Sequence, residues 1–143
     1  MLIASSDQVL VNSIGQNIVN EELILDKKIT VLTISDHPLL PSGVGTQTKY
    51  VIEALLRSGK FNVISLGGAV KHQDYTPQKI DGYPGFWEIF PVDGYGNAQL
   101  VNAFINDRKP DILYFMTDPR FYEWLWSIDD TIRKSIPMVY YHV

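Results

Sequence analysis

ITVLTISDHPLLPSGVGTQTKYVIEALLRSG, residues 29–59, is the stretch that decides the fold of this chain. Its first seven residues are a short, apolar and β-branched run, which predicts a buried strand. Residues 46–58 place apolar side chains on one stripe of a 3.6-residue period, which predicts an amphipathic helix: Val51, Ile52, Leu55 and Leu56. Gly59 follows at the position where helices commonly end in a left-handed residue. The stretch therefore predicts a strand, a polar loop and a helix in succession.

The loop between this strand and helix has the form of an anion-binding site. It contains Gly43 and Gly45, whose missing side chains would let a ligand approach the backbone. The first N–H groups of a helix have no partner within it, and the positive end of the helix dipole faces the same point. We therefore expect Gly43, Val44 and Gly45 to face a phosphate group, with a simple tight turn as the alternative.

Strands and amphipathic helices alternate through the rest of the chain. Apolar runs at 61–66, 86–92, 111–116 and 137–142 predict four more strands. Helices are predicted from Asn97 to Pro110 and after Asp118, which suits a helix N-cap and is followed by proline. The pattern predicts an α/β fold, a Rossmann-like parallel sheet with helices on both faces and strand order 3-2-1-4-5. The turn-rich segment 71–84 is expected to form a hairpin or an irregular loop.

Length and composition limit the class of protein. With 143 residues the chain is one domain by size, with residues 1–28 expected as an extension packed on a domain at 29–143. A net charge of −4 without a Lys/Arg cluster argues against a nucleic-acid partner. Cysteine is lacking, which excludes disulfides and thiolate chemistry, and three scattered histidines make a transition-metal site unexpected. No apolar run is long enough for a membrane span and no secretory signal begins the chain, which fits a cytoplasmic protein.

The loop after the first strand can be compared with the common phosphate-binding loops. A Walker A loop needs a Gly-Lys-Ser/Thr run, which this sequence lacks. A dinucleotide fingerprint needs a third glycine where Thr48 stands, and an acidic residue near the end of the second strand, where 60–73 contains none. The remaining type is a longer loop with prolines that ends in Ser-Gly-Val-Gly at the start of a helix.

That arrangement resembles the first strand–helix loop of family 4 retaining glycosyltransferases, which have the GT-B fold. Three segments carry the resemblance: KKITVLTISDHPLLPSGVGTQTKYVIEALLRSGKFNVISLG (27–67), NAFINDRKPDILYFMTDPRFYEWLW (102–126) and IPMVYYHV (136–143). They span residues 28–143, which would correspond to the N-terminal, acceptor-side half of such an enzyme. The resemblance implies a single half of a GT-B architecture, without the C-terminal donor-binding domain, and a chain that is catalytically incomplete alone.

The activity implied by the resemblance is transfer of a hexose from a UDP- or GDP-sugar to a small-molecule, glycan or lipid acceptor, with retention and without a tightly bound cofactor or metal. Gly43, Val44 and Gly45 match the loop that lies against the donor diphosphate. Asp118, Arg120 and His142 match the acceptor-side loops by position only. The family often has His-Glu-Pro after its fourth strand, whereas this chain has Thr117, Asp118 and a proline. A histidine role at that place is therefore not expected.

Further candidates for substrate contacts are Asp36, His37 and Thr46, which flank the loop at the expected carboxyl edge of the sheet. Each candidate also has a simpler interpretation. Asp36 and His37 could close the loop, Asp118 could be only a helix N-cap, and His142 could be a core imidazole. A cation such as Arg120 is mildly unfavourable in a first helical turn, which indicates a partner such as an acidic group of the acceptor. The aromatic residues at 121–126 are expected in the core rather than in a sugar platform.

The alternative to a transferase is a non-catalytic, doubly wound binding or regulatory module. A phosphate-receiving regulatory domain would need a pair of acidic residues after the first strand, where Asp36 stands alone. We also expect self-association, because a missing partner domain would leave an apolar surface exposed.

Overall fold

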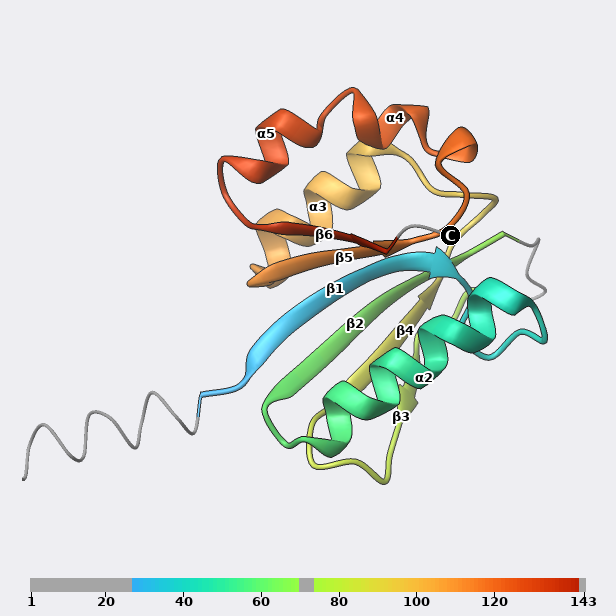
Figure 1. The fold of residues 1–143 in the computed structure, drawn as a ribbon, viewed down its shortest axis with the longest axis vertical. Helices are drawn as coiled ribbons and strands as arrows, with labels where there is room; N and C mark the ends of the chain where they lie inside the picture. The colour runs from blue at the N-terminus through green and yellow to red at the C-terminus, as the bar shows by residue number, and fades with distance from the viewer. Residues whose placement is uncertain (1–26, 70–73, 142–143) are drawn as a thin grey trace, which may run out of the picture.

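The computed structural model describes residues 27–69 and 74–141, which form one six-stranded sheet with helices on both faces (Figure 1). The sheet order is β3-β4-β2-β1-β5-β6. The central strand β1 (Ile29–Asp36) pairs in parallel with β2 (Phe61–Gly68) and β5 (Ile112–Met116). Outside these lie two further parallel strands, β4 (Trp87–Pro91) and β6 (Met138–Tyr141), and one antiparallel strand, β3 (Gln78–Ile80).

The sixth strand corrects the predicted strand order. The five predicted strands are present, but β3 adds an antiparallel edge beyond β4, so the order 3-2-1-4-5 is wrong for the whole sheet. Gln78 pairs with Ile89 and Ile80 pairs with Trp87, which makes segment 78–91 a hairpin. Three residues give too short a run for a period-2 pattern to stand out in the sequence. The fold class is thus an α/β fold with a mostly parallel sheet.

One long helix covers one face of the sheet, and several shorter helices cover the other (Figure 1). Helix α2 (Gly43–Arg57) lies over β1 and β2 and buries Ile52 and Leu56. On the opposite face lie α3 (Ala98–Arg108), the 3-10 turn η1 (Pro119–Phe121), α4 (Glu123–Trp126) and α5 (Asp129–Arg133). The Asn97 side chain accepts from the Leu100 N–H at 2.9 Å, which confirms the predicted N-cap of α3.

The predicted helix after Asp118 is broken into three short pieces. Asp118 caps η1 as predicted, because its side chain accepts from the Arg120 N–H. The chain then bends at Tyr122, whose backbone lies outside the helical region, before α4 begins. The aromatic side chains on this segment drive the bend by burial: Tyr122 is enclosed, and the Trp126 indole N–H donates to the Pro119 carbonyl at 3.0 Å. The prediction that these aromatics belong mainly to the core is confirmed for Tyr122.

The core is divided by the sheet. On the face of α3 to α5, eleven buried side chains form the larger cluster, with Leu32, Phe115 and Leu125 at its centre. On the face of α2, Trp87 packs with Ile52, Leu56, Val63 and Ile89. Here the Ser65 hydroxyl accepts from Thr33 at 2.9 Å and from the Trp87 indole at 3.0 Å, across three neighbouring strands. The fixed sheet holds the loops at its carboxyl edge in place.

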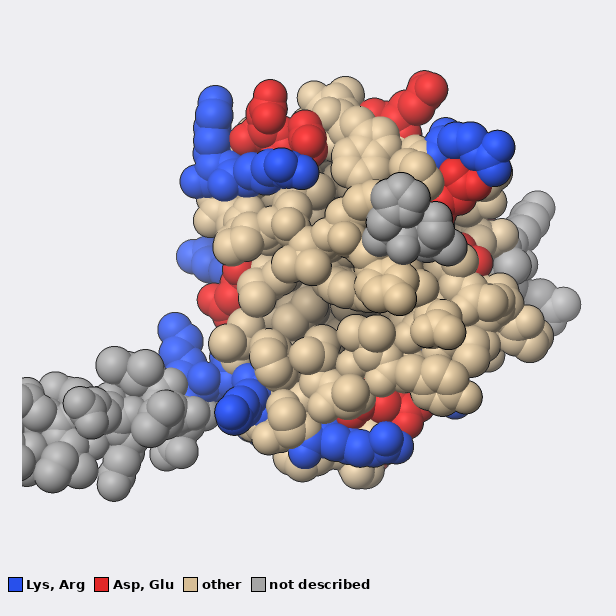
Figure 2. All heavy atoms as spheres, in the orientation of Figure 1, with Lys and Arg blue, Asp and Glu red and all other residues tan. Residues whose placement is uncertain are grey.

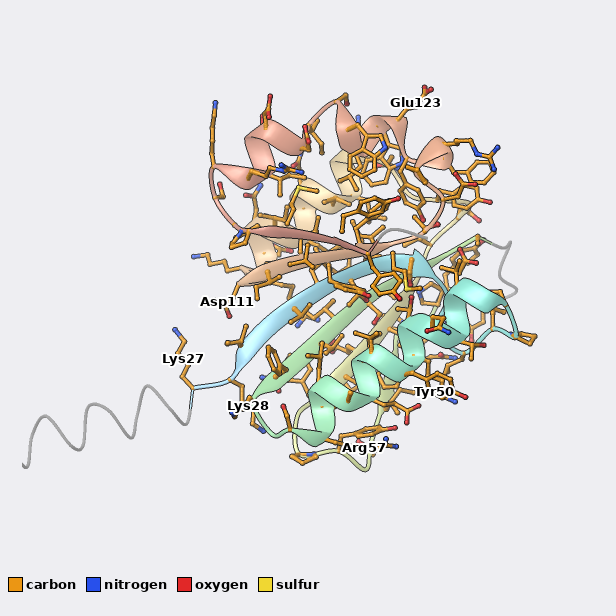
Figure 3. All side chains as sticks on the ribbon, viewed as in Figure 1. Lys27, Lys28, Tyr50, Arg57, Asp111 and Glu123 are labelled. Atoms are coloured by element: carbon orange, nitrogen blue, oxygen red, sulfur yellow. The ribbon has the colours of Figure 1, made fainter. Side chains whose placement is uncertain are left out.

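The start of β1 is fastened to the start of β5. The Asp111 carboxylate accepts from the Thr30 N–H at 2.9 Å, and the Asp111 N–H donates to the Thr30 carbonyl at 2.8 Å. Figure 3 shows Asp111 beside the chain that enters β1 through Lys27 and Lys28. Residues 1–26, for which an extension is predicted, lie outside the described residues.

Charged side chains gather at the margins of the face that contains β6. Figure 2 shows a band without Lys, Arg, Asp or Glu across the middle of this face, over β6 and β1. Val139 and Tyr141 of β6 contribute to it, with 46% and 49% of their surface exposed. Within 27–69 and 74–141, the helices are all too short or too polar to span a lipid bilayer.

Candidate functional site

The sheet changes direction between β1 and β5. From β1 the chain moves outward through β2 and β4, and it then returns to the other side of β1 with β5 and β6. Connections that leave two adjacent strands in opposite directions open a crevice at their carboxyl ends, where open α/β sheets bind ligands. Asp36 ends β1 at this point, and Thr117 and Asp118 follow β5. The topology therefore brings the predicted site residues Asp36 and Asp118 to one edge of the sheet.

His37 anchors the loop that follows β1. His37 is 6% exposed, and its backbone N–H donates to the Gly68 carbonyl at 3.0 Å. The Nδ1 atom of its ring accepts from the Leu39 N–H at 3.1 Å. The ring lies so close to Gly67 that a Cβ there would be 2.7 Å from the imidazole Cδ2. Nδ1 is therefore occupied as an acceptor, and the imidazole is packed against the end of β2.

Ser42 links the end of β1 to the start of α2. Its hydroxyl donates to the Asp36 carboxylate at 3.0 Å and accepts from the Gly45 N–H at 2.9 Å, so it is the N-cap of the helix. The prediction that the helix begins at Thr46 is wrong by three residues, because Gly43, Val44 and Gly45 form its first turn. Ser42 stands three residues before Gly45, the usual spacing between an N-cap side chain and the amide it accepts from, and the sequence analysis did not use this signal.

The three residues of this first turn differ in their accessibility. The N–H groups of Gly43 and Val44 have no hydrogen-bond acceptor among the described residues, whereas the Gly45 N–H is bonded to Ser42. A Cβ on Gly43 would meet no atom within 4 Å, so its backbone is open to a ligand. A Cβ on Gly45 would lie 2.7 Å from the His37 carbonyl oxygen. Gly45 therefore serves the packing of the loop, and the free amides are those of Gly43 and Val44.

Thr46 lies on another side of the loop. Its N–H donates to the Ser42 carbonyl at 2.9 Å as part of the helix. Its side chain lines a small cavity of about 210 Å³ between the loop and α2, together with Pro38, Leu39, Leu40, Pro41, Lys49 and Tyr50. Figure 3 labels Tyr50 on α2, where its ring is largely exposed. Neither Asp36 nor Ser42 lines this cavity.

Asp118 and Arg120 form an exposed ion pair in the loop that follows β5. The guanidinium Nε lies 3.0 Å from both carboxylate oxygens, and Nη2 lies 2.5 Å from Oδ2. These side-chain hydrogen bonds, with a further one from the Arg120 N–H, lower the pKa of Asp118 to about 2. Asp118 is therefore the partner of this guanidinium within the chain, whereas the acidic acceptor group predicted for position 120 stays a prediction. The Arg120 side chain is 81% exposed and remains accessible to a ligand.

The buried Tyr122 lies close to both loops at this edge, the one that follows β1 and the one that follows β5. Its side chain is 1% exposed, and burial raises the pKa of its phenol. A hydrogen bond with the Thr117 side chain opposes this shift, and the charge of Asp36 adds to it, so the phenol lies near both loops. Sequence reasoning placed Tyr122 in the core but gave it no place at the site. His142, predicted at the same edge, lies outside the described residues.

The arrangement offers hydrogen-bond acceptors, free backbone amides and one cation. Asp36 and Asp118 supply carboxylate acceptors, Gly43 and Val44 supply free amides, and Arg120 supplies a cation. Within the part of the chain that the structure describes, no three His, Asp or Glu side chains cluster closely enough to hold a metal ion.

Comparisons with models of protein families, with curated proteins and with solved structures found no significant match.

Proposed function

We propose that this chain is the acceptor-side, Rossmann-like half of a GT-B glycosyltransferase that moves a sugar from a UDP- or GDP-sugar to an acceptor hydroxyl with retention. The observation that carries the proposal is the pair of free amides, Gly43 and Val44, at the start of a 15-residue helix beside the point where the sheet changes direction. Free amides and the helix dipole stabilise a negative group there. In the reaction they would hold the leaving diphosphate as its charge grows.

The two carboxylates at the edge have a different part in this proposal. Asp36 and Asp118 are hydrogen-bond acceptors, which suits the hydroxyl groups of an acceptor sugar or alcohol. The charge of Asp36 opposes an anion close to the helix start, so this edge alone would hold a diphosphate weakly. The proposal therefore needs cations from a second, donor-binding domain, which closes over the crevice and excludes water.

The experiment is a titration of the isotopically labelled chain with UDP, GDP and their hexose conjugates, followed by NMR of the backbone amides. We expect saturable shifts of the Gly43 and Val44 signals with one nucleotide, and no shift of the Val44 signal in the Gly43→Val variant. Transfer activity is then assayed with the donor that binds, in the presence of a separately produced donor domain. Unchanged Gly43 and Val44 signals with every donor at millimolar concentration would refute the diphosphate role.

A non-catalytic binding module for polyhydroxylated ligands is the second candidate. The hydrogen bond from Ser42 to Asp36 favours this candidate. It holds the Asp36 carboxylate near the start of α2, where the carboxylate already takes up part of the stabilisation that the helix would give to a phosphate. The two functions differ in one measurement. A binding module would shift signals near Asp36 and Asp118 with free sugars but give no shift at Gly43 and Val44 with UDP or GDP.

A further inference from the structure

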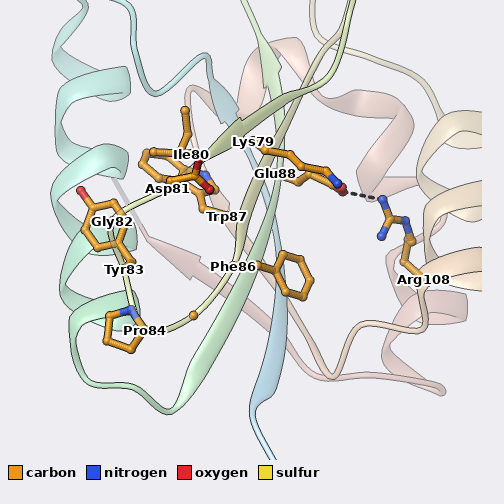
Figure 4. A pocket seen from close by; sticks show the side chains of 11 residues that line it. Lys79, Ile80, Asp81, Gly82, Tyr83, Pro84, Phe86, Trp87, Glu88 and Arg108 are labelled. Carbon is orange, nitrogen blue, oxygen red and sulfur yellow. Dashed lines mark hydrogen bonds and ion pairs between the residues drawn. The ribbon is translucent and has the colours of Figure 1, made fainter.

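A second cavity lies at the opposite end of the sheet. It has a volume of about 480 Å³, within the range of roughly 300–1,000 Å³ that is typical of small-molecule sites. We call it the hairpin cavity, because the β3–β4 hairpin forms most of its wall, including Lys79, Phe86 and Glu88, with Arg108 from α3 (Figure 4). The parallel strand β4 begins here, so the cavity is at the amino end of the sheet, away from Asp36 and Gly43.

The base of the hairpin is held firmly against β2. A Cβ on Gly85 would lie 2.0 Å from the Phe61 carbonyl oxygen, so the backbones touch at this point. The Phe86 N–H donates to the Asn62 side chain at 3.0 Å, and the Phe86 carbonyl accepts from the Val63 N–H at 2.9 Å. These contacts fix the backbone of Phe86, and a fixed residue loses little conformational entropy when a ligand binds.

An aromatic ring is exposed on this fixed strand. Phe86 has 47% of its surface exposed, although the neighbouring Trp87 is 2% exposed on the other face of the sheet. Figure 4 shows the Phe86 ring on the same side of β4 as the Glu88–Arg108 ion pair, as expected for residues two apart in a strand. A flat apolar surface is therefore presented next to charged groups.

The charges on this side of the hairpin are predominantly positive. Arg108 Nη2 lies 2.5 Å from the Glu88 carboxylate, and its guanidinium stacks over the Phe90 ring at 5.5 Å. Lys79 is the cross-strand partner of Glu88, so one carboxylate faces two cations. Asp81 also lines the cavity, but Figure 4 shows it on the other side of the hairpin, beside Ile80. Donor groups of Lys79 and Arg108 thus remain for an anion.

We propose that the hairpin cavity binds a small aromatic anion, whose ring stacks on Phe86 and whose carboxylate or phosphate faces Lys79 and Arg108. The ligand combines the two features that this side of the cavity offers, a flat apolar surface and excess positive charge. An aromatic carboxylate and a nucleoside monophosphate share this chemistry. The proposal is independent of the function proposed for the carboxyl edge, because it uses none of the same residues.

The test uses benzoate and AMP as probes of the two sources, with benzamide and adenosine as neutral counterparts and inorganic phosphate as an anion without a ring. Each probe is titrated into the labelled chain, and NMR follows the Phe86 amide and the Arg108 side-chain N–H. We expect saturable shifts with benzoate or AMP, and binding about tenfold weaker for the matching neutral compound. Shifts with benzoate alone assign the site to carboxylates, and shifts with AMP alone assign it to nucleotides.

Matched variants locate the binding. Phe86→Ala and Arg108→Gln should each weaken it about tenfold, whereas Lys109→Asn, which removes a charge at the same helix end outside the cavity, should leave it unchanged. Circular dichroism verifies that each variant is folded, and Phe86→Leu tests for a flat ring without removing the apolar surface. The proposal is overturned if neither benzoate nor AMP gives saturable shifts, if Phe86→Ala and Arg108→Gln bind as tightly as the parent chain, or if the AMP shifts occur at Gly43 and Val44.

Discussion

The Ser42 hydroxyl donates a hydrogen bond to the Asp36 carboxylate at 3.0 Å, across the loop that separates β1 from α2. The same hydroxyl accepts from the Gly45 N–H, so one side chain fixes both the carboxylate and the first turn of the helix. The position of Asp36 at the candidate site is thereby coupled to the stability of α2. A substitution at Ser42 should change both.

We predict that Ser42→Ala lowers the free energy of unfolding by ~1 kcal/mol, because the helix loses its N-cap. Urea denaturation followed by tryptophan fluorescence measures this change. Ser135→Ala is the matched control, since its exposed side chain has no hydrogen bond among the described residues and should change stability by less than about 0.5 kcal/mol. Equal effects of the two substitutions would show that the Ser42 cap contributes little.

Gly43 and Gly45 separate the ligand role from the packing role of the loop. Gly45→Ala places a Cβ 2.7 Å from the His37 carbonyl oxygen, so the loop must shift, and we predict a loss of about 1–3 kcal/mol in unfolding free energy. Gly43→Ala has open space and should leave stability unchanged within about 0.5 kcal/mol. The same urea denaturation compares both variants. A destabilised Gly43→Ala variant would contradict the open geometry at this position.

The fold followed from features that local sequence patterns express. The apolar run of β1 and the helical stripe of α2 predict their elements, because burial on both faces of a sheet leaves a continuous apolar strand. The edge strand β3 was not predicted, because only Ile80 of its three residues is apolar and its pairing with β4 is long-range information. The predicted helix after Asp118 is interrupted at Tyr122, which is buried. The helix propensities of these residues contain no signal for such an interruption, because it depends on tertiary packing.

The candidate site was predictable in place but not in detail. Asp36 ends β1, His37 follows it and Asp118 follows β5, and the ends of parallel strands meet at one edge of the sheet. The burial of His37 against Gly67 and the place of Thr46 in the small cavity beside α2 depend on how the loop folds back on itself. That path is set by contacts between the loop and β2, which residue types within the loop do not encode.

The Asp118–Arg120 pair predicts a measurable titration. The pKa of Asp118 is lowered to about 2 from an ordinary 3.8, mainly by hydrogen bonds from the Arg120 side chain. We predict that Arg120→Gln raises this pKa toward 3.8, leaving the smaller effect of the backbone N–H at position 120. The pKa of Asp118 is lower in the folded chain than in the unfolded chain. The pair therefore stabilises the fold at pH values above 3.8, and this contribution is lost as the pH falls toward 2. Carbon-13 NMR of the carboxyl groups measures the titration, and an unchanged pKa in the variant would contradict the pairing.

The exposed edge strand predicts self-association of the chain. Val139 and Tyr141 lie on the face of β6 that α2 leaves uncovered. Among the described residues β6 is the last strand of the sheet, and its outer edge has no strand partner there, so it can pair with a second copy. We predict that Val139→Lys shifts the chain toward monomer in sedimentation velocity, with unchanged circular dichroism. Tyr50→Lys is the control, because this exposed ring lies on α2 away from the edge. A chain that is monomeric at every concentration would refute the prediction.

Ser65 holds two buried donors on the α2 face of the sheet. Its Oγ accepts from the Thr33 hydroxyl and from the Trp87 indole, and all three side chains are at most 2% exposed. Ser65→Ala leaves both donors without a partner, so we predict a loss of roughly 2–4 kcal/mol in unfolding free energy. Ser35→Ala is the matched control, because Ser35 is equally buried and its hydroxyl donates to the Asp36 carbonyl. Removing this hydroxyl leaves no buried donor without a partner, so the loss in unfolding free energy should be about 1 kcal/mol. Urea denaturation measures both, and the emission of Trp87 should shift in the Ser65 variant alone. Equal losses would show that the two donors find other partners when the serine is removed.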